Sequence, residues 1–191
     1  KSVNANYWYQ RLRGFEVDDF SSERKSIGHS YALPRPALDL KVLSPLLYRL
    51  CEKAGRRLRA NGFQAQGIFL SCAVRGDRGF NHVEKLPQPI YTSEDIFNRA
   101  FKILQSAIRD KLLVSPVSVL AVSLFRLTVP RAQPLNFLES VVEKEKLTQA
   151  LDSINDRFGE FTIFPGELLG LDRKIIDRIA FGEIRDLGYT S

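Results

Sequence analysis

Apolar and polar residues alternate along four stretches of the chain, and each stretch predicts a β-strand. The clearest lies over residues 64–74, where Ile68, Leu70, Cys72 and Val74 point to one face and the residues between them to the other. Residues 118–129 predict a long and largely buried strand. Shorter strands are predicted over residues 28–33, before the turn signal of Pro34, and over residues 81–86.

Apolar residues at helical spacing predict two helices between these strands. The first begins at Ser44-Pro45, with proline near its first turn, and ends at Asn61-Gly62 in a left-handed cap. The second begins at Thr92 or Ser93, whose hydroxyl caps the first turn. The polar face of the first helix is basic, which is typical of a solvated helix surface. Its basic residues are Lys53, Arg56, Arg57 and Arg59.

The predicted order of elements is β-α-β-β-α-β. This order predicts an α+β fold with two helices on one face of a four-stranded sheet. The opposite face is then free to bind a partner, and alternation makes it mostly small or polar, with Phe69 and Phe125 as exceptions. The small or polar positions are Ser71, Ala73, Arg75, Ala121 and Ser123. An RNA-recognition sheet needs a paired aromatic motif, which residues 67–74 do not form.

Composition divides the chain into three parts. Residues 1–24 carry several aromatic residues and then an acidic, serine-rich stretch, which predicts the end of a preceding domain and a linker. Residues 25–130 hold the α+β domain. Residues 131–191 form a mixed C-terminal extension with an amphipathic helix that ends at Gly159. Because the chain starts at Lys1 and contains no methionine, we expect it to be part of a longer protein.

The charge and the cysteine content indicate which class of partner the chain could bind and in which cellular compartment it is expected. The 28 basic and 22 acidic residues give a net charge of +6, which is compatible with a polyanionic partner. No apolar run approaches the roughly 20 residues that span a bilayer, so no membrane partner is expected. Cys51 and Cys72 lie among apolar positions without metal-binding spacing, which predicts buried free thiols in a reducing cytoplasm.

No catalytic motif is visible in the sequence. The two histidines, His29 and His82, lack the spacing of metal ligands. The acidic pairs Asp18-Asp19 and Glu94-Asp95 fit a linker and a helix start rather than a two-metal centre. Glycine-rich phosphate loops and nucleophile elbows are also missing from the sequence. The chain is therefore predicted to be non-catalytic and to hold no metal or cofactor.

Five stretches, spread over nearly the whole chain, carry a resemblance to a known family. They read YWYQRLRGFEVDDFSSERKSIGHSYALP, LCEKAGRRLRANGF, AFKILQSAI, SVLAVSLFRL and KLTQALDSINDRFGEFTI. In this order and spacing they resemble the C-terminal part of Y-family translesion DNA polymerases. The resemblance implies the end of the thumb, the little finger domain and an extension. It also implies a parent DNA-directed DNA polymerase whose palm carboxylates, in another part of the protein, bind Mg²⁺.

The resemblance further implies a site. The little finger of this family lays its sheet in the major groove of the primer–template and binds phosphates, which carry little sequence information. The implied contacts in the first strand are Lys25, Ser26, Gly28 and His29. Those in the second and last strands are Arg75, Ser118, Ser123 and Arg126.

Two departures from the family pattern affect this site. Relatives often place arginines where Ser118 and Ser123 stand, so the grip is expected to be weaker or more local. Arg126 shares the alternation of Leu124, so it faces outward only where a bulge or the strand end intervenes.

A second resemblance lies just after the last strand. Bacterial relatives often carry a sliding-clamp-binding peptide there, a glutamine followed by hydrophobic residues, and Gln133, Leu135 and Phe137 occupy the corresponding region. Asn136 stands where a hydrophobic residue is usual. The alternative is a linker whose apolar residues pack on the domain.

Three function hypotheses remain open at this point. The leading one is a cytoplasmic, nucleoid-associated DNA-binding domain that grips primer–template DNA without sequence specificity. The alternative is a protein-interaction module that docks a partner such as the sliding clamp, and a purely structural domain is the third. Substitution of Lys25 and Arg75 separates them, because only the first hypothesis predicts a general loss of DNA affinity.

Overall fold

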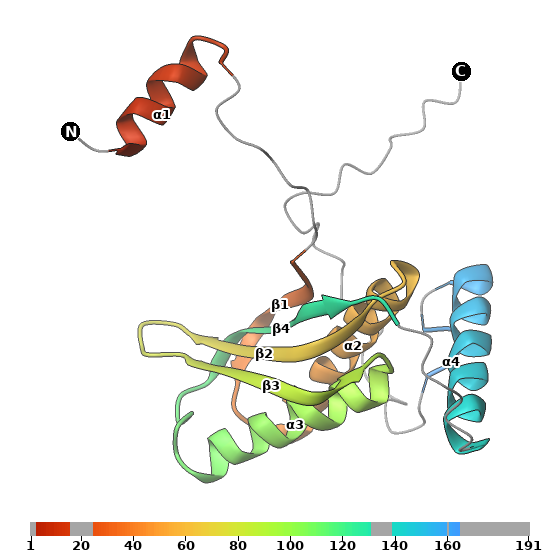
Figure 1. Cartoon of the computed structure of the whole chain (residues 1–191). Coiled ribbons are helices and arrows are strands. Elements are labelled where there is room, and N and C mark those ends of the chain that lie inside the picture. The colour runs from red at the N-terminus through yellow and green to blue at the C-terminus, as the bar shows by residue number, and fades with distance from the viewer. Residues whose placement is uncertain (1–2, 16–24, 131–138, 160, 165–191) are drawn as a thin grey trace, which may run out of the picture.

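The computed structural model describes residues 3–15, 25–130, 139–159 and 161–164 (Figure 1). Four helices and four strands lie in these ranges. The helices are α1 (Val3–Leu12), α2 (Leu40–Ala60), α3 (Ser93–Arg109) and α4 (Glu139–Phe158). The strands are β1 (Ser26–Ala37), β2 (Gln64–Val74), β3 (Phe80–Ile90) and β4 (Val117–Thr128).

The four strands form one sheet in the order β1-β4-β2-β3, and all neighbours are antiparallel. Helices α2 and α3 pack against each other and cover one face of the sheet, α2 over β1 and β4 and α3 over β2 and β3 (Figure 1). The predicted α+β fold with the order β-α-β-β-α-β is therefore confirmed. None of the described helices is both long and apolar enough to cross a membrane.

The core lies between the sheet and the two helices. Leu124 of β4 pairs in register with Ile27 of β1 and Ile68 of β2, and all three side chains are buried. Helix α2 adds an apolar stripe that includes Leu43, Leu47, Leu50 and Leu58. Burial of such side chains supplies most of the favourable free energy of a domain of this size.

Helix α2 starts earlier than predicted. It begins at Leu40 with Asp39 as N-cap, whose carboxylate accepts a hydrogen bond from the Lys41 amide at 2.8 Å. Pro45 is therefore inside the helix, past its first turn, and the predicted start at Ser44-Pro45 is wrong. The predicted end is confirmed, because Gly62 has a φ of +68° and the Phe63 amide donates to the Leu58 carbonyl at 3.0 Å.

Strands β1 and β3 are longer than their predicted counterparts. Pro34 and Pro36 lie inside β1, and Pro87 and Pro89 lie inside β3. In sequence analysis such prolines are expected to end a strand, because proline has no backbone N–H to donate to the hydrogen bonds of a sheet. Both strands are at the edges of the sheet, so one side of each has no neighbour that needs the missing donors.

Helix α4 continues to Phe158 and is followed by Gly159 with a φ of +107°, in agreement with the predicted end. The sequence FTIF, residues 161–164, is typical of a short extended piece, but residues 161–163 form a turn and bends instead. The four basic residues of α2 do not form a solvated surface, and that prediction is wrong. Arg59 is only 13% exposed and pairs with Asp152 of α4, and Arg56 pairs with Asp156.

Candidate nucleic-acid interface

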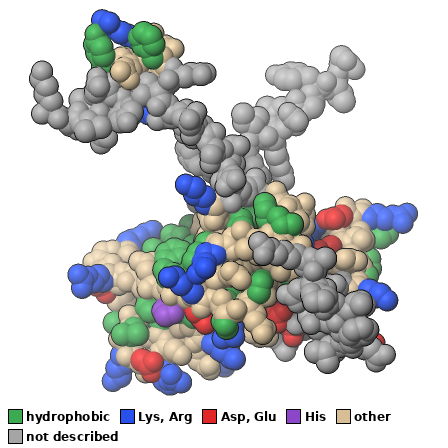
Figure 2. Space-filling model, viewed as in Figure 1, with side chains coloured by type: hydrophobic (Ala, Val, Ile, Leu, Met, Phe, Trp, Pro, Cys, Tyr) green, Lys and Arg blue, Asp and Glu red, His purple; other side chains and the backbone are tan. Residues whose placement is uncertain are grey.

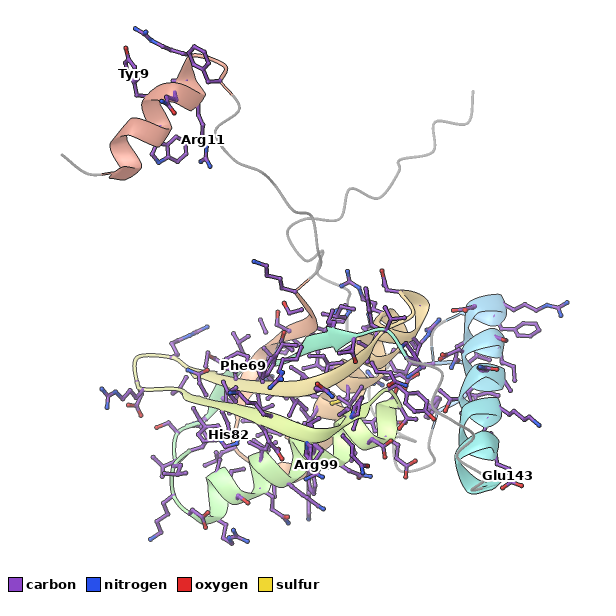
Figure 3. All side chains as sticks on the ribbon, viewed as in Figure 1. Tyr9, Arg11, Phe69, His82, Arg99 and Glu143 are labelled. Atoms are coloured by element: carbon purple, nitrogen blue, oxygen red, sulfur yellow. The ribbon has the colours of Figure 1, made fainter. Side chains whose placement is uncertain are left out.

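The sheet face opposite α2 and α3 is built from short rows of side chains that run across the strands. Strand register defines three full rows and part of a fourth. From one end of the sheet they are Ser26–Phe125–Gly67–Lys85, then Gly28–Ser123–Phe69–Val83, then Ser30–Ala121–Ser71–Asn81, then Ala32–Val119–Ala73. This face is the one predicted from alternation, and the rows contain its two aromatic residues, Phe125 and Phe69. Figure 3 labels Phe69.

Cations outnumber carboxylates on this face and at its ends. No carboxylate occurs in the rows, and Lys85 is their one charged member. Exposed Lys25 stands next to Ser26, just before β1, and exposed Arg126 stands next to Phe125 on β4, so three cations lie at that end. Exposed Arg75 and Arg78 lie at the opposite end, in the turn between β2 and β3, with Asp77 between them accepting a hydrogen bond from the Ser115 hydroxyl. Figure 2 shows both Lys or Arg and Asp or Glu side chains on the viewed side of the molecule.

Lys85 was missed by the sequence reasoning. It stands in a weakly alternating stretch between His82 and Leu86, where the strand was predicted but its faces were not assigned. The register pairs Lys85 with Gly67, which places Lys85 on the open face. Continuing the alternation of β2 across the turn into β3 is the signal that could have found it.

Two glycines let the strands and one ring lie close together. A Cβ on Gly28 would stand 2.6 Å from the carbonyl oxygen of Val122, so β1 and β4 approach closely beside Ser123. A Cβ on Gly67 would stand 2.4 Å from ring atoms of Phe125, so the ring of Phe125 lies directly over Gly67. The ring therefore stays low on the sheet.

Arg126 has an irregular backbone near the C-terminal end of β4. Its φ is +54°, in the left-handed region that non-glycine residues rarely adopt. The neighbouring Leu127 packs against the core, whereas regular alternation from Leu124 would turn it to the open face. Arg126 was expected to face outward only where a bulge or the strand end breaks the alternation, and this irregularity breaks it. The side chain of Arg126 is exposed beside Phe125.

The predicted contacts fall into three locations. Lys25, Ser26, Gly28, Ser123 and Arg126 come together at one end of the open face. Arg75 and Ser118 belong to the other end, where Arg75 is roughly 30 Å from Lys25 and Arg126 at about 3.3 Å per residue. The Ser118 hydroxyl there donates to the carbonyl oxygen of Ala73 at 3.0 Å.

His29 lies on the other side of the sheet. It shares the alternation of Ile27, and its Nε2 stands 3.5 Å from Nη1 of Arg57 in α2. Its side chain is therefore separated from Ser26 and Gly28 by the thickness of the sheet.

Three further sequence predictions concern thiols, metals and the clamp. Both Cys51 and Cys72 are buried and free, as predicted. Within the described ranges no three metal-ligating side chains come together. Gln133, Leu135 and Phe137 lie outside the described residues, and the clamp peptide stays a prediction.

Comparison with known proteins identifies the family. A family model described as the C-terminal domain of the impB/mucB/samB family matches residues 24–138, well over half of the chain. The chain belongs to this family. The resemblance to the little finger region of Y-family polymerases is thereby confirmed.

Relatives agree with this membership. The protein named DNA polymerase IV 2 of Bacillus subtilis (strain 168) is 27% identical over 188 residues, which is 93% of this chain and 44% of that protein. DNA polymerase IV of Pelotomaculum thermopropionicum is 28% identical over 148 residues, 77% of this chain and 36% of that protein. The chain thus spans less than half the length of these relatives.

A solved structure supports the same fold. A chimera of the Y-family DNA polymerases Dbh and Dpo4 superposes with a TM-score of 0.52 and 21% identity, over 68% of this chain and 36% of that chain.

Proposed function

We propose that this chain is the DNA-binding module of a translesion DNA polymerase and that the open sheet face lies against the backbone of primer–template DNA. The observation that carries the proposal is the composition of that face. Most members of its rows are small or carry a hydroxyl, the rows contain no carboxylate, and cations stand at both of its ends.

Small side chains allow a phosphate to approach the sheet closely, and hydroxyls such as those of Ser26 and Ser123 can donate to its oxygens. Lys25, Lys85 and Arg126 add charge at one end, where neutralised phosphates release counterions. Because the two cationic ends are roughly 30 Å apart, they bind different phosphates of the duplex. None of these groups needs a base edge, so binding is independent of sequence.

Polymerase activity and the Mg²⁺ that serves it are assigned to other parts of the parent protein. The relatives named DNA polymerase IV are more than twice as long as the matched region. The module's part is to hold the duplex while the chemistry takes place elsewhere. Because its contacts are to phosphate, it tolerates a damaged base in the duplex that it holds.

The test is a titration of this chain with primer–template DNA at several salt concentrations. We expect the affinity to fall linearly with salt on logarithmic axes. Lys25→Gln with Arg126→Gln removes two cations from one end, and Arg75→Gln with Arg78→Gln removes two from the other. Each pair lowers the salt slope by about two, for every sequence tested.

The matched control is Lys41→Gln with Lys102→Gln, which removes the same charge from exposed positions on the two covering helices. A face-specific site predicts a much smaller change for this control. Equal losses for all three pairs, or binding that ignores salt, would contradict the proposal.

Contact with a sliding clamp through residues 133–137 is a separate proposal that rests on the sequence resemblance. Gln133→Ala with Phe137→Ala is then expected to abolish retention of the chain on an immobilised clamp and to leave DNA binding unchanged. Retention by the doubly substituted chain would end this proposal.

A further inference from the structure

The ring of Phe125 lies face-on over the backbone of Gly67 on the open face of the sheet. A Cβ on Gly67 would stand 2.4 Å from Cε2, 2.4 Å from Cζ and 2.7 Å from Cε1 of that ring. Three successive ring atoms at such similar distances mean that this point lies under the face of the ring, because a point beyond the ring edge would be clearly nearer to one or two of them. One face of the ring is therefore turned toward the sheet and the other away from it.

The outer face of this ring is accessible. Phe125 is half-buried, as expected for a ring with one covered face. Its partner on β1 is Ser26, and the next row begins with Gly28 and Ser123. Because these neighbours are small, a flat group can lie on the ring from this side.

Three cations lie close to the ring. Lys85 pairs with Gly67, so it stands one strand away, about 5 Å between backbones. Arg126 directly follows the ring residue in β4, and Lys25 immediately precedes β1, the neighbouring strand. All three side chains are exposed. Proteins that bind single-stranded nucleic acid combine these two features, with bases stacked on aromatic rings and phosphates bound by cations.

We propose that the outer face of Phe125 is a stacking site for one unpaired nucleobase, and that Lys25, Lys85 and Arg126 bind the phosphates on either side of that base. Inside a duplex the neighbouring pairs cover both faces of a base, so only an unpaired base stacks on the ring. Every base has such a face, so the site tolerates any sequence. This proposal rests on the proposed function, because its phosphate contacts are those of the open face, and it names a strand with an unpaired base as the ligand of this end.

Packing alone is the alternative role of the ring. An aromatic ring over a glycine also stabilises a sheet, since it covers backbone that has no side chain of its own. That role requires no ligand. The two roles differ in one respect, because only the stacking site distinguishes a strand with bases from a strand without them.

The test compares two single-stranded probes on the full chain, one of ten thymidines and one of ten abasic sites with the same phosphates. We expect the thymidine strand to bind about tenfold more tightly, which is the size of the effect of one stacked base. Phe125→Leu removes the aromatic face and should bring the two affinities to the same value. An unaltered chain without this preference, or a preference that persists in Phe125→Leu, would overturn the proposal.

Two variants serve as controls. Phe69→Leu is the matched one, because Phe69 is the other aromatic residue of the open face and both its neighbours in the row, Ser123 and Val83, carry side chains. It should keep most of the preference, and a loss equal to that of Phe125→Leu would refute the assignment to one ring. Phe125→Tyr keeps the ring and should keep the preference, whatever the stability of Phe125→Leu, and its loss in Phe125→Tyr would also count against stacking.

Fluorescence reports on the contact directly. Trp8 is the only tryptophan in the sequence, so Trp8→Phe with Phe125→Trp leaves one indole, at the site itself. The thymidine strand should quench its emission, and the abasic strand should quench it much less. Equal quenching by both strands would refute stacking.

The abasic probe also separates this proposal from the proposed function. Salt-dependent binding of the abasic strand, with no preference for thymidine, would refute the stacking site and leave the phosphate-binding face standing. If neither strand binds, and primer–template DNA does not bind either, the proposed function itself fails.

Discussion

Single residues set how closely a partner can approach the sheet. The ring of Phe125 lies over Gly67, and the irregular backbone of Arg126 turns its cation away from the core beside that ring. The open face is therefore low where the ring of Phe125 covers Gly67, and it carries a positive charge at the next residue, Arg126. A side chain of any size at Gly67 would lift the ring and change both properties.

Gly67→Ala is expected to destabilise the domain by about 1–3 kcal/mol, because its Cβ would stand 2.4 Å from the ring of Phe125. Chemical denaturation measures this cost. In a chain that already carries Phe125→Ala, the same substitution should cost much less, since the clash has been removed. An equal cost in both backgrounds would show that the backbone of Gly67, rather than the ring, excludes alanine.

Buried Cys72 makes stability depend on alkaline pH. Burial raises the pKa of the Cys72 thiol to about 12 from an ordinary value of 9.0. The unfolded chain therefore releases this proton first, and the stabilisation is complete below pH 9 and is lost as the pH rises toward 12. The slope is at most about 1.4 kcal/mol per pH unit.

Cys72→Ala is expected to flatten the fall in unfolding free energy between pH 8 and 10.5, whatever its effect on packing at neutral pH. Ser71→Ala is the matched control, because it removes a non-titrating group from the next position on the open face. An unchanged slope in Cys72→Ala would assign the alkaline loss to other groups.

Some ends of helices and strands could be predicted from a few neighbouring residues, and others could not. The cap of α2 at Gly62 and the cap of α3 at Thr92 were predictable, because each depends on two or three adjacent residues. The start of α2 was not, because Asp39 is as good a cap as Ser44 and only tertiary packing decides how far the helix extends. The prolines of β1 were misjudged because edge position is a property of the sheet and not of the strand.

The cap of α3 gives a prediction at this scale. The Thr92 hydroxyl accepts from the Asp95 amide at 3.2 Å and donates to the Asp95 carboxylate at 2.6 Å. Thr92→Val keeps the buried volume and loses both bonds, so we expect a loss of about 1 kcal/mol in chemical denaturation. Thr92→Ser keeps the hydroxyl and should cost less. The reverse order would mean that the methyl group matters more than the cap.

For the whole molecule, the open face could be predicted and the contact between α2 and α4 could not. Alternation in β2 and β4 fixes which side chains share a face, so Ser123 and Phe69 were placed correctly from sequence. The pairing of Arg59 with Asp152 joins residues 93 positions apart, and no local pattern links them. From sequence alone, a basic helix face is expected to be exposed to solvent. Only the structure shows that α4 lies on this face of α2 and pairs two carboxylates with its arginines.

Docking of α4 by ion pairs predicts that salt releases this helix before the rest of the domain. The screening length falls from about 10 Å at 0.1 M salt to about 3 Å at 1 M, while apolar burial in the core is not weakened. Amide NMR shifts of residues 139–158 should therefore move between 0.05 and 1 M sodium chloride, while those of α2 and α3 change little away from Arg56 and Arg59. In Asp152→Asn with Asp156→Asn, α4 should already show the high-salt shifts at low salt. Shifts of α4 that ignore salt in the unaltered chain would mean that Leu151 and Ile154, rather than the carboxylates, hold α4 in place.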